Sequence, residues 1–182
     1  MNLYFRVLLT LLKNLFQRIR CSITDKMVWT GRVLPNDIDV FGHMNNGRYL
    51  TLIGLALFDA GIKSGNFKAT VKFKYVYLFS NTDIQWIKPL RLFEKFSIES
   101  HLKYWEHNRA YVEVEFRNGK GQVVSKASYK VVIKSPVRRG VTWRDLMPAD
   151  VLEARDTLDA IETLDASPTV KPNFAKRLDR TG

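Results

Sequence analysis

The residues best suited to chemistry lie in one short stretch, D-I-D-V-F-G-H-M-N-N-G-R-Y, which runs from Asp37 to Tyr49. It places two carboxylates, an imidazole and two carboxamides ahead of an apolar run that predicts a helix to about residue 62. Asn45 and Asn46 are both good N-cap residues, so Asp39 is expected near the unpaired N–H groups and the positive dipole end of this helix. A carboxylate in that position suits a base or nucleophile beside a carbonyl whose oxyanion needs donors.

The elements around this stretch predict an α+β fold. Period-two patterns and turn residues predict strands over the ranges 27–34, 70–79, 84–87, 93–105, 110–116 and 122–133, with a break at 80–81 and a hairpin turn at 118–121. The helix is apolar almost all round, so it must be wrapped rather than lie on a surface. We therefore expect a curved antiparallel sheet around one long helix.

The stretch also resembles a known family, the hotdog-fold thioesterases. It is similar to the 4-hydroxybenzoyl-CoA thioesterase group and to the D-x-D-V-x-x-H-V-N-N pattern of plant acyl-carrier-protein thioesterases. Ile87-Lys88-Pro89-Leu90-Arg91 matches the family's turn and residues 93–133 match its closing strands, so the resemblance covers about residues 26–135. It implies the hotdog fold, hydrolysis of an acyl-CoA or acyl-carrier-protein thioester, and a dimer or tetramer in which sheets join edge to edge.

Three residues take catalytic roles by this resemblance. Asp39 matches the carboxylate that serves as nucleophile or general base, and the choice between the two stays open. Asn46 matches the position whose backbone N–H points at the thioester oxygen. His43 matches a histidine in the catalytic set of the plant relatives, and its alternative is a structural hydrogen bond. Asp37 is interpreted as a turn or solvent-facing residue.

Four further residues are expected to contact substrate: Phe41, Gly42, Asn45 and Tyr49. Gly42 would allow the loop to approach the substrate closely. Phe41 stands where the plant pattern has Asn, which favours a simpler mechanism of carboxylate plus backbone donor and an apolar surface near the acyl chain. Aromatic residues that could line an acyl pocket, or could be ordinary core, are Phe58, Tyr75, Tyr77, Phe79 and Trp86.

The composition of the chain limits the kinds of partner that it is expected to bind. The formal net charge of +11 favours an anionic partner, such as a phosphate-bearing ligand or acidic lipid. No aromatic-interleaved basic motif indicates nucleic acid. Cys21 is the single cysteine, which fits a reducing compartment, so a cytoplasmic location is expected. The three histidines lack metal-ligand spacing, and we expect neither a metal nor a cofactor.

Residues 2–20 carry four basic residues and no acidic one. Tyr4, Leu8, Leu11, Leu12, Leu15 and Ile19 form an apolar stripe at helical spacing, while Arg6, Thr10, Lys13, Asn14 and Gln17 lie opposite. The sequence predicts a basic amphipathic helix. It either packs on the domain or across a dimer, or it lies peripherally on an anionic membrane. In the second case its removal should leave hydrolysis unaffected.

The chain is therefore divided into an N-terminal helix at 1–25, a thioesterase domain at 26–140 and a C-terminal extension at 141–182. Short helices are expected at 143–146 and 149–164, followed by a loosely held tail. Two alternatives to the thioesterase remain. One is an acyl-CoA hydratase or dehydratase on the same fold with Asp39 and His43 as an acid–base pair, and the other is a non-catalytic, membrane-attached acyl-binding protein.

Overall fold

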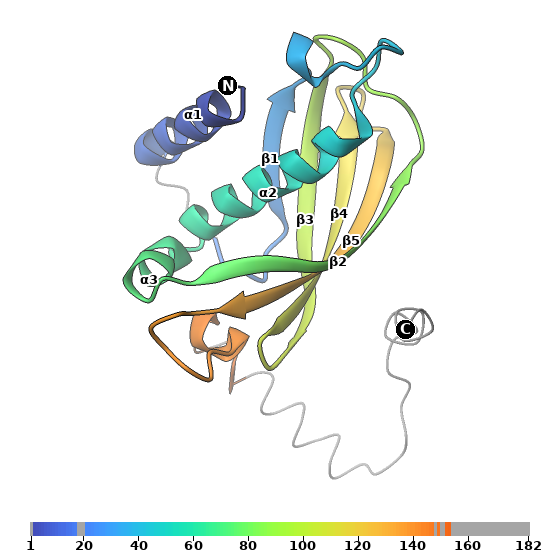
Figure 1. Cartoon of the computed structure of the whole chain (residues 1–182). Coiled ribbons are helices and arrows are strands. Elements are labelled where there is room, and N and C mark those ends of the chain that lie inside the picture. The colour runs from blue at the N-terminus through green and yellow to red at the C-terminus, as the bar shows by residue number, and fades with distance from the viewer. Residues whose placement is uncertain (1, 18–20, 148, 150–151, 154–182) are drawn as a thin grey trace, which may run out of the picture. The chain divides into compact units, whose positions relative to one another are not determined.

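The fold was obtained as a computed structural model, which describes residues 2–17, 21–147, 149 and 152–153. The described part of the chain contains a five-stranded antiparallel sheet in the order β1-β3-β4-β5-β2 (Figure 1). Its strands are β1 (Met27–Arg32), β2 (Val76–Trp86), β3 (Lys95–Glu106), β4 (Arg109–Asn118) and β5 (Val123–Lys134). Long hydrogen-bonded ladders join β2 to β5, β5 to β4 and β4 to β3, whereas β1 and β2 form the two edges.

The helix α2 (Asn46–Lys63) lies in the concave face of the sheet, which curves around it (Figure 1). Its buried residues include Leu52, Ile53 and Leu55, and Phe116 of β4 is buried as well. Tight packing of a nearly all-apolar helix against a curved sheet explains the architecture. The α+β hotdog prediction is thus confirmed.

The strand predicted at 70–79 is wrong over its first half. The structure has a short helix, α3 (Asn66–Lys72), where alternation predicted the start of a strand. Gly65 precedes α3 with a φ of 77°, a conformation that suits glycine. The strand β2 begins only at Val76, and its register shifts between Phe79 and Asn81, where the sequence predicted a break.

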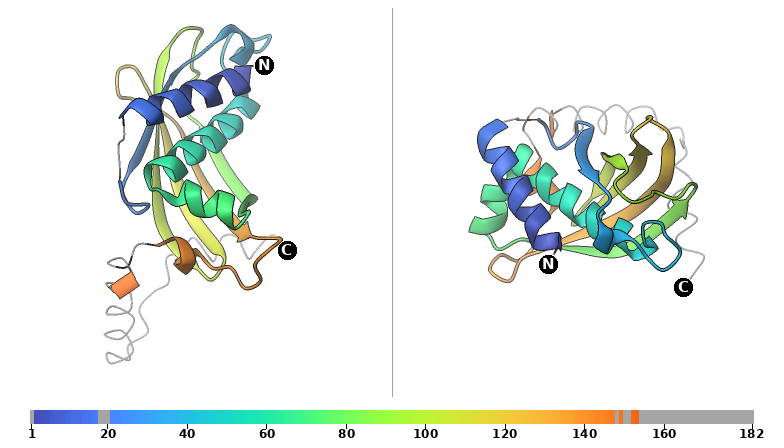
Figure 2. Two further views of the ribbon diagram at one scale, coloured as in Figure 1. Left: turned by 90° about the vertical axis from the view of Figure 1, so that its left-hand side faces the viewer. Right: turned by 90° about the horizontal axis from the view of Figure 1, so that it is seen from above.

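The N-terminal helix α1 (Asn2–Gln17) lies beside α2 in the two views of Figure 2. It contacts the domain through its polar side. Arg6 and Thr10 are buried, and the Asn14 amide donates a 2.7 Å hydrogen bond to Asp59 of α2. The helix therefore packs on the domain, as one sequence interpretation proposed, but with its polar rather than its apolar face inward.

Residues 141–147 also belong to this compact unit, which spans Met1–Met147. Val141, Trp143 and Leu146 are buried, and a 3₁₀ turn, η2 (Trp143–Leu146), stands where a short helix was predicted. The unit thus continues past the expected boundary at 140. The remainder, Pro148–Gly182, forms a separate unit, and most of the helix predicted for 149–164, with the whole tail, lies outside the described residues.

Candidate active site

The motif loop is held by a buried carboxylate, Asp37. The loop opens with a 3₁₀ turn, η1 (Pro35–Asp37), which brings the fully buried Asp37 side chain back onto the backbone N–H of Leu34 at 2.9 Å. The guanidinium groups of Arg6 in α1 and Arg48 in α2 also bind this carboxylate, the latter with 3.0 Å between Nη2 and Oδ1. Asp37 therefore ties α1, the loop and the first turn of α2 together. Asp37 is thus a turn residue, as the sequence predicted, but the solvent-facing alternative is wrong because its side chain is fully buried.

Asp39 lies two residues further on, at the point where the loop turns. Its Oδ1 accepts a 2.9 Å hydrogen bond from the N–H of Phe41, and its backbone pairs with His43 and Gly42 at 3.0 and 3.1 Å. Gly42 has a φ of 78°, a left-handed conformation that an L side chain rarely adopts. The tight turn leaves the Asp39 side chain 17% exposed, so the carboxylate is oriented yet reachable.

The amino terminus of α2 supplies a candidate oxyanion donor. Asn45 is the N-cap, and its side-chain oxygen accepts a 2.9 Å hydrogen bond from the N–H of Gly47. Asn46 is the first helical residue, is exposed, and donates its backbone N–H to no acceptor among the described residues. An unpaired N–H at the positive end of a helix dipole suits the stabilisation of a developing negative charge.

The imidazole of His43 stands beside the carboxylate of Asp39 but is not hydrogen-bonded to it. Its Nδ1 is 3.7 Å from Oδ2 of Asp39, which is longer than a hydrogen bond, and 3.4 Å from the carbonyl oxygen of Met44. The ring stacks at 6.2 Å on that of Phe41, and His43 pairs with Arg91 across an isolated bridge. Phe41 is 80% exposed, in line with an apolar surface at the motif.

Tyr49, expected at the substrate, lies in the core instead. It is 1% exposed, and its ring packs 4.8 Å from that of Phe116. Burial raises the pKa of its hydroxyl to about 12, partly opposed by a hydrogen bond to the backbone of Leu90. We assign Tyr49 to the packing of α2 against the sheet.

Exposed apolar side chains surround the motif. Val40 and Phe41 lie in the loop itself, and Leu92 and Phe93 follow the turn that pairs with His43. They are between 44% and 93% exposed. Large exposed apolar side chains gathered at one place mark a binding surface.

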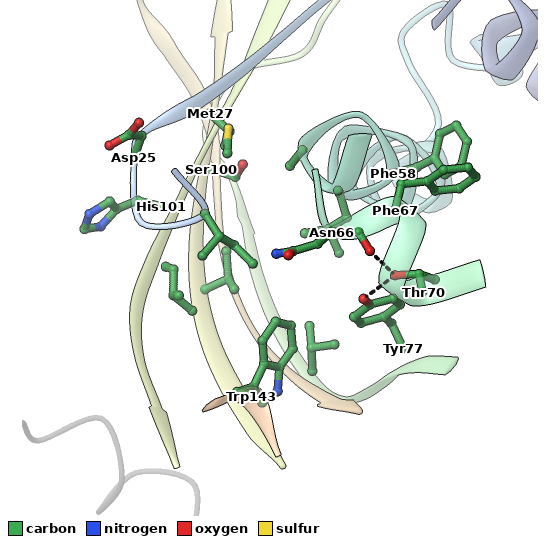
Figure 3. Close-up of a pocket in the computed structure, with 18 of the residues that line it drawn as sticks. Asp25, Met27, Phe58, Asn66, Phe67, Thr70, Tyr77, Ser100, His101 and Trp143 are labelled. Atoms are coloured by element: carbon green, nitrogen blue, oxygen red, sulfur yellow. Dashed lines mark hydrogen bonds between the residues drawn. The ribbon is translucent and has the colours of Figure 1, made fainter. Parts of the chain in front are cut away.

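An apolar cavity of about 390 Å³ lies elsewhere, between the carboxyl half of α2, α3 and the sheet (Figure 3). Its wall includes Phe58, Tyr77 and Phe79, three of the five aromatic residues considered for an acyl pocket, but not Tyr75 or Trp86. Within its wall, the hydroxyls of Thr70 in α3 and Tyr77 in β2 form a hydrogen bond of 2.7 Å.

The cavity is separate from the motif. No motif residue lines it, and its nearest helical residue, Gly54, lies eight positions past Asn46, or about 12 Å along α2. The buried side chains of Tyr49, Leu52 and Ile53 occupy the intervening turn. Within one chain, the Asp39 carboxylate is therefore reachable from the exposed side of the loop and not from this cavity.

Sequence reasoning missed two residues that support the site, Arg6 and Arg48. Arg48 carried a usable signal, because a cation in the first turn of α2 lies close to a carboxylate that precedes the helix. Arg6 carried none, since its partner is 31 residues away. Among the described residues, no three histidine, cysteine, aspartate or glutamate side chains gather as metal ligands.

Comparison with known proteins defines the class. The family model of the thioesterase-like superfamily matches residues 33–154, and the chain belongs to that superfamily. Protein THEM6 of Xenopus laevis is 33% identical over 122 residues, which is 67% of this chain and 59% of the relative. The chain thus spans less than two thirds of that relative's length.

Solved structures support the same fold. The probable thioesterase YbaW from Escherichia coli is similar with a TM-score of 0.58 and 22% identity, covering 65% of this chain and 90% of that one. Protein SAV2348 from Staphylococcus aureus, determined in complex with CoA, is similar with a TM-score of 0.60 and 16% identity, covering 84% and 92%. The fold is that of the hotdog thioesterases.

Proposed function

We propose that the protein hydrolyses the thioester of an acyl-CoA, with Asp39 as the reactive carboxylate and the Asn46 N–H as oxyanion donor. The observation that carries the proposal is a reachable, oriented carboxylate that precedes by seven residues an unpaired N–H at the start of α2. Membership of the thioesterase-like superfamily supports the reaction class. The similar SAV2348 structure, determined with CoA, supports CoA as the carrier, with an acyl-carrier protein as the other candidate.

The reaction needs only groups that the loop and α2 provide. Asp39 takes a proton from water as the water oxygen attacks the thioester carbonyl, and the Asn46 N–H binds the oxyanion that forms. Collapse breaks the carbon–sulfur bond, and the proton held by Asp39 passes to the departing thiolate. In the nucleophilic variant Asp39 attacks the carbonyl itself and expels the thiolate, which leaves a mixed anhydride; water then cleaves the anhydride, restores the Asp39 carboxylate and supplies the proton that the thiolate takes.

The distance between Asp39 and His43 favours this reaction over hydration. A hydratase would need the two side chains as a hydrogen-bonded acid–base pair, whereas they are 3.7 Å apart. His43 instead stacks on Phe41 and helps to shape the entrance to the site.

The first test is substitution of the carboxylate. Hydrolysis of an acyl-CoA series of graded chain length, followed by detection of the free thiol, should identify a substrate. Asp39→Asn should then lower kcat about a hundredfold or more, while Asp83→Asn, an exposed aspartate outside the motif, should not. Retention of more than about a third of kcat by the Asp39 variant would exclude it as the catalytic group. A chain that binds but does not cleave acyl-CoA would instead support the acyl-binding alternative.

The second test isolates the backbone donor. Asn46 is the first helical residue, a position that tolerates proline, and the ψ of 135° at Asn45 suits a residue before proline. Asn46→Pro removes the N–H and Asn46→Ala keeps it. We expect the proline variant to lose about 10²–10³ in kcat relative to the alanine variant. Equal rates would exclude this N–H from the reaction.

We also propose a dimer, formed through the exposed edge of the sheet. The edge strand β2 is 11 residues long and carries exposed Val76, Leu78, Phe79 and Trp86. Long apolar edges are normally paired or covered. Sedimentation analysis should show a dimer at micromolar concentration, or a tetramer built from it, and a monomer would refute the pairing.

We propose that the protein is located in the cytoplasm, at the surface of a membrane. The single cysteine and the acid-free segment 2–20 support it. None of the described helices combines the length and apolarity needed to cross a bilayer.

A further inference from the structure

The helix α1 has its apolar face turned to the outside. Its large apolar side chains are between 39% and 81% exposed, namely Tyr4, Phe5, Leu8, Leu9, Leu11, Leu12, Leu15 and Phe16. A surface helix ordinarily places such a face against the core. The arrangement is the reverse of that expected from burial of apolar surface.

Three polar anchors fix this orientation. Arg6 binds Asp37, Thr10 Oγ1 accepts a 3.3 Å hydrogen bond from the Trp29 indole, and Asn14 donates to Asp59 at 2.7 Å. The anchors are spaced by four residues, so they form one stripe along the helix. Because that stripe is held against the domain, the opposite, apolar stripe must face outward.

The charge of this surface favours an anionic partner. Residues 2–20 contain no acidic side chain, Lys13 is exposed, and Arg32 lies across the hollow at the side of α1. In the sequence, Arg18 and Arg20 follow directly. No acidic residue within 2–20 could pair with these cations, whereas anionic lipid headgroups would.

We infer that α1 docks on an anionic phospholipid bilayer, with its axis in the plane of the surface. The apolar stripe would enter the boundary between headgroups and acyl chains, over the roughly 24 Å length of a 16-residue helix. Lys13 meets the anionic headgroups. Arg6 cannot meet the headgroups because it is buried against Asp37.

Membrane docking in this form specifies the surface for the proposed peripheral location, and it does not depend on hydrolysis. Co-sedimentation of the full chain with phosphatidylcholine vesicles, with and without phosphatidylserine, measures it directly. We expect binding to the anionic vesicles that weakens with salt, since screening reduces the attraction.

Leu15→Glu tests the apolar stripe, because this side chain is 70% exposed and its loss should leave the fold intact. The variant should bind anionic vesicles about tenfold less tightly or worse, since it loses an apolar anchor and gains repulsion. Val137→Glu introduces the same charge at a 58% exposed valine outside α1 and should bind like the wild type. Lys13→Gln should weaken binding about fivefold, the equivalent of one cation near the surface.

The contrary outcomes are distinct. Equal vesicle binding by the Leu15 and Val137 variants, with unchanged thermal unfolding, would overturn the proposal. If the wild-type chain does not bind vesicles, and if Leu15→Glu lowers the molecular mass found by sedimentation, α1 would instead form a contact between two copies of the chain. Hydrolysis is measured separately, so a failure of docking and a failure of the thioesterase proposal cannot be confused.

Discussion

Removal of the Arg6 guanidinium should destabilise the whole unit, although Arg6 lies in the N-terminal helix. Asp37 is fully buried, and both Arg6 and Arg48 form ion pairs with its carboxylate. Burial lowers the pKa of Arg6, and the Asp37 carboxylate opposes this. Arg6→Met keeps the packing of the side-chain stem while it leaves a buried carboxylate short of one partner.

The magnitude follows from the contacts that remain. Loss of one partner of a buried ion pair typically costs about 3–5 kcal/mol. Asp37 keeps Arg48 at 3.0 Å and the Leu34 N–H at 2.9 Å, so we take the lower end, about 3 kcal/mol. For a chain of this size each kcal/mol lowers Tm by about 2–4 °C, so Tm should fall by about 6–12 °C.

Urea denaturation and calorimetry measure both quantities. The matched control is Lys13→Met, which removes an exposed cation from the same helix and should change stability by less than about 0.5 kcal/mol. Adding Asp37→Asn to Arg6→Met should restore part of the loss, because the uncompensated charge disappears. A loss of under about 1 kcal/mol, or one no larger than that of the Lys13 variant, would refute the coupling.

Two further variants test the turn and the surface charge. Gly42→Ala should lower the free energy of unfolding by about 1–2 kcal/mol and should also lower kcat, because a φ of 78° is strained for a residue with a side chain. Its control is Gly54→Ala, which lies within α2 with open space at its Cβ and should be neutral or stabilising. Urea denaturation measures both variants. The pKa of Glu99 is lowered, chiefly by its hydrogen bond to Lys26 and then by Arg117. Its contribution to stability is therefore complete above about pH 4.3, the ordinary pKa of glutamate, and is lost as the pH falls through the folded-state pKa. Unfolding free energies should therefore differ between wild type and Glu99→Gln at neutral pH and converge in acid, and a constant difference would contradict the assignment.

The sequence predicted the strands well but not α3. Alternation of Val71, Phe73 and Tyr75 with lysines suggested a strand from residue 70, yet Val71 ends up 62% exposed on a short helix. Alternation is informative where one face of a strand is buried. Here the chain is still turning after Gly65, and pairing with β5 begins only at Val76, which depends on long-range contacts.

The candidate site, like the fold, was predictable only in part from the sequence. The motif itself, with Asp39 near the start of α2, follows from local signals such as the N-cap and the glycine turn. The burial of Asp37 does not, because it depends on a cation from α1 that meets the loop only in the folded chain. Tyr49 was expected at the substrate, and only its packing against Phe116 in the folded chain shows which way its side chain points.

The link between α1 and the motif changes what removal of the helix should do. The membrane interpretation of the sequence expected hydrolysis to survive the loss of α1, but Arg6 reaches a carboxylate two residues before Asp39. Deletion of α1 would leave Asp37 with Arg48 as its remaining described cation and would expose the faces of Trp29 and Asp59 that α1 covers. A truncated chain therefore confounds loss of docking with damage to the site. Leu15→Glu separates them, because it alters the outward stripe and leaves the three anchors in place.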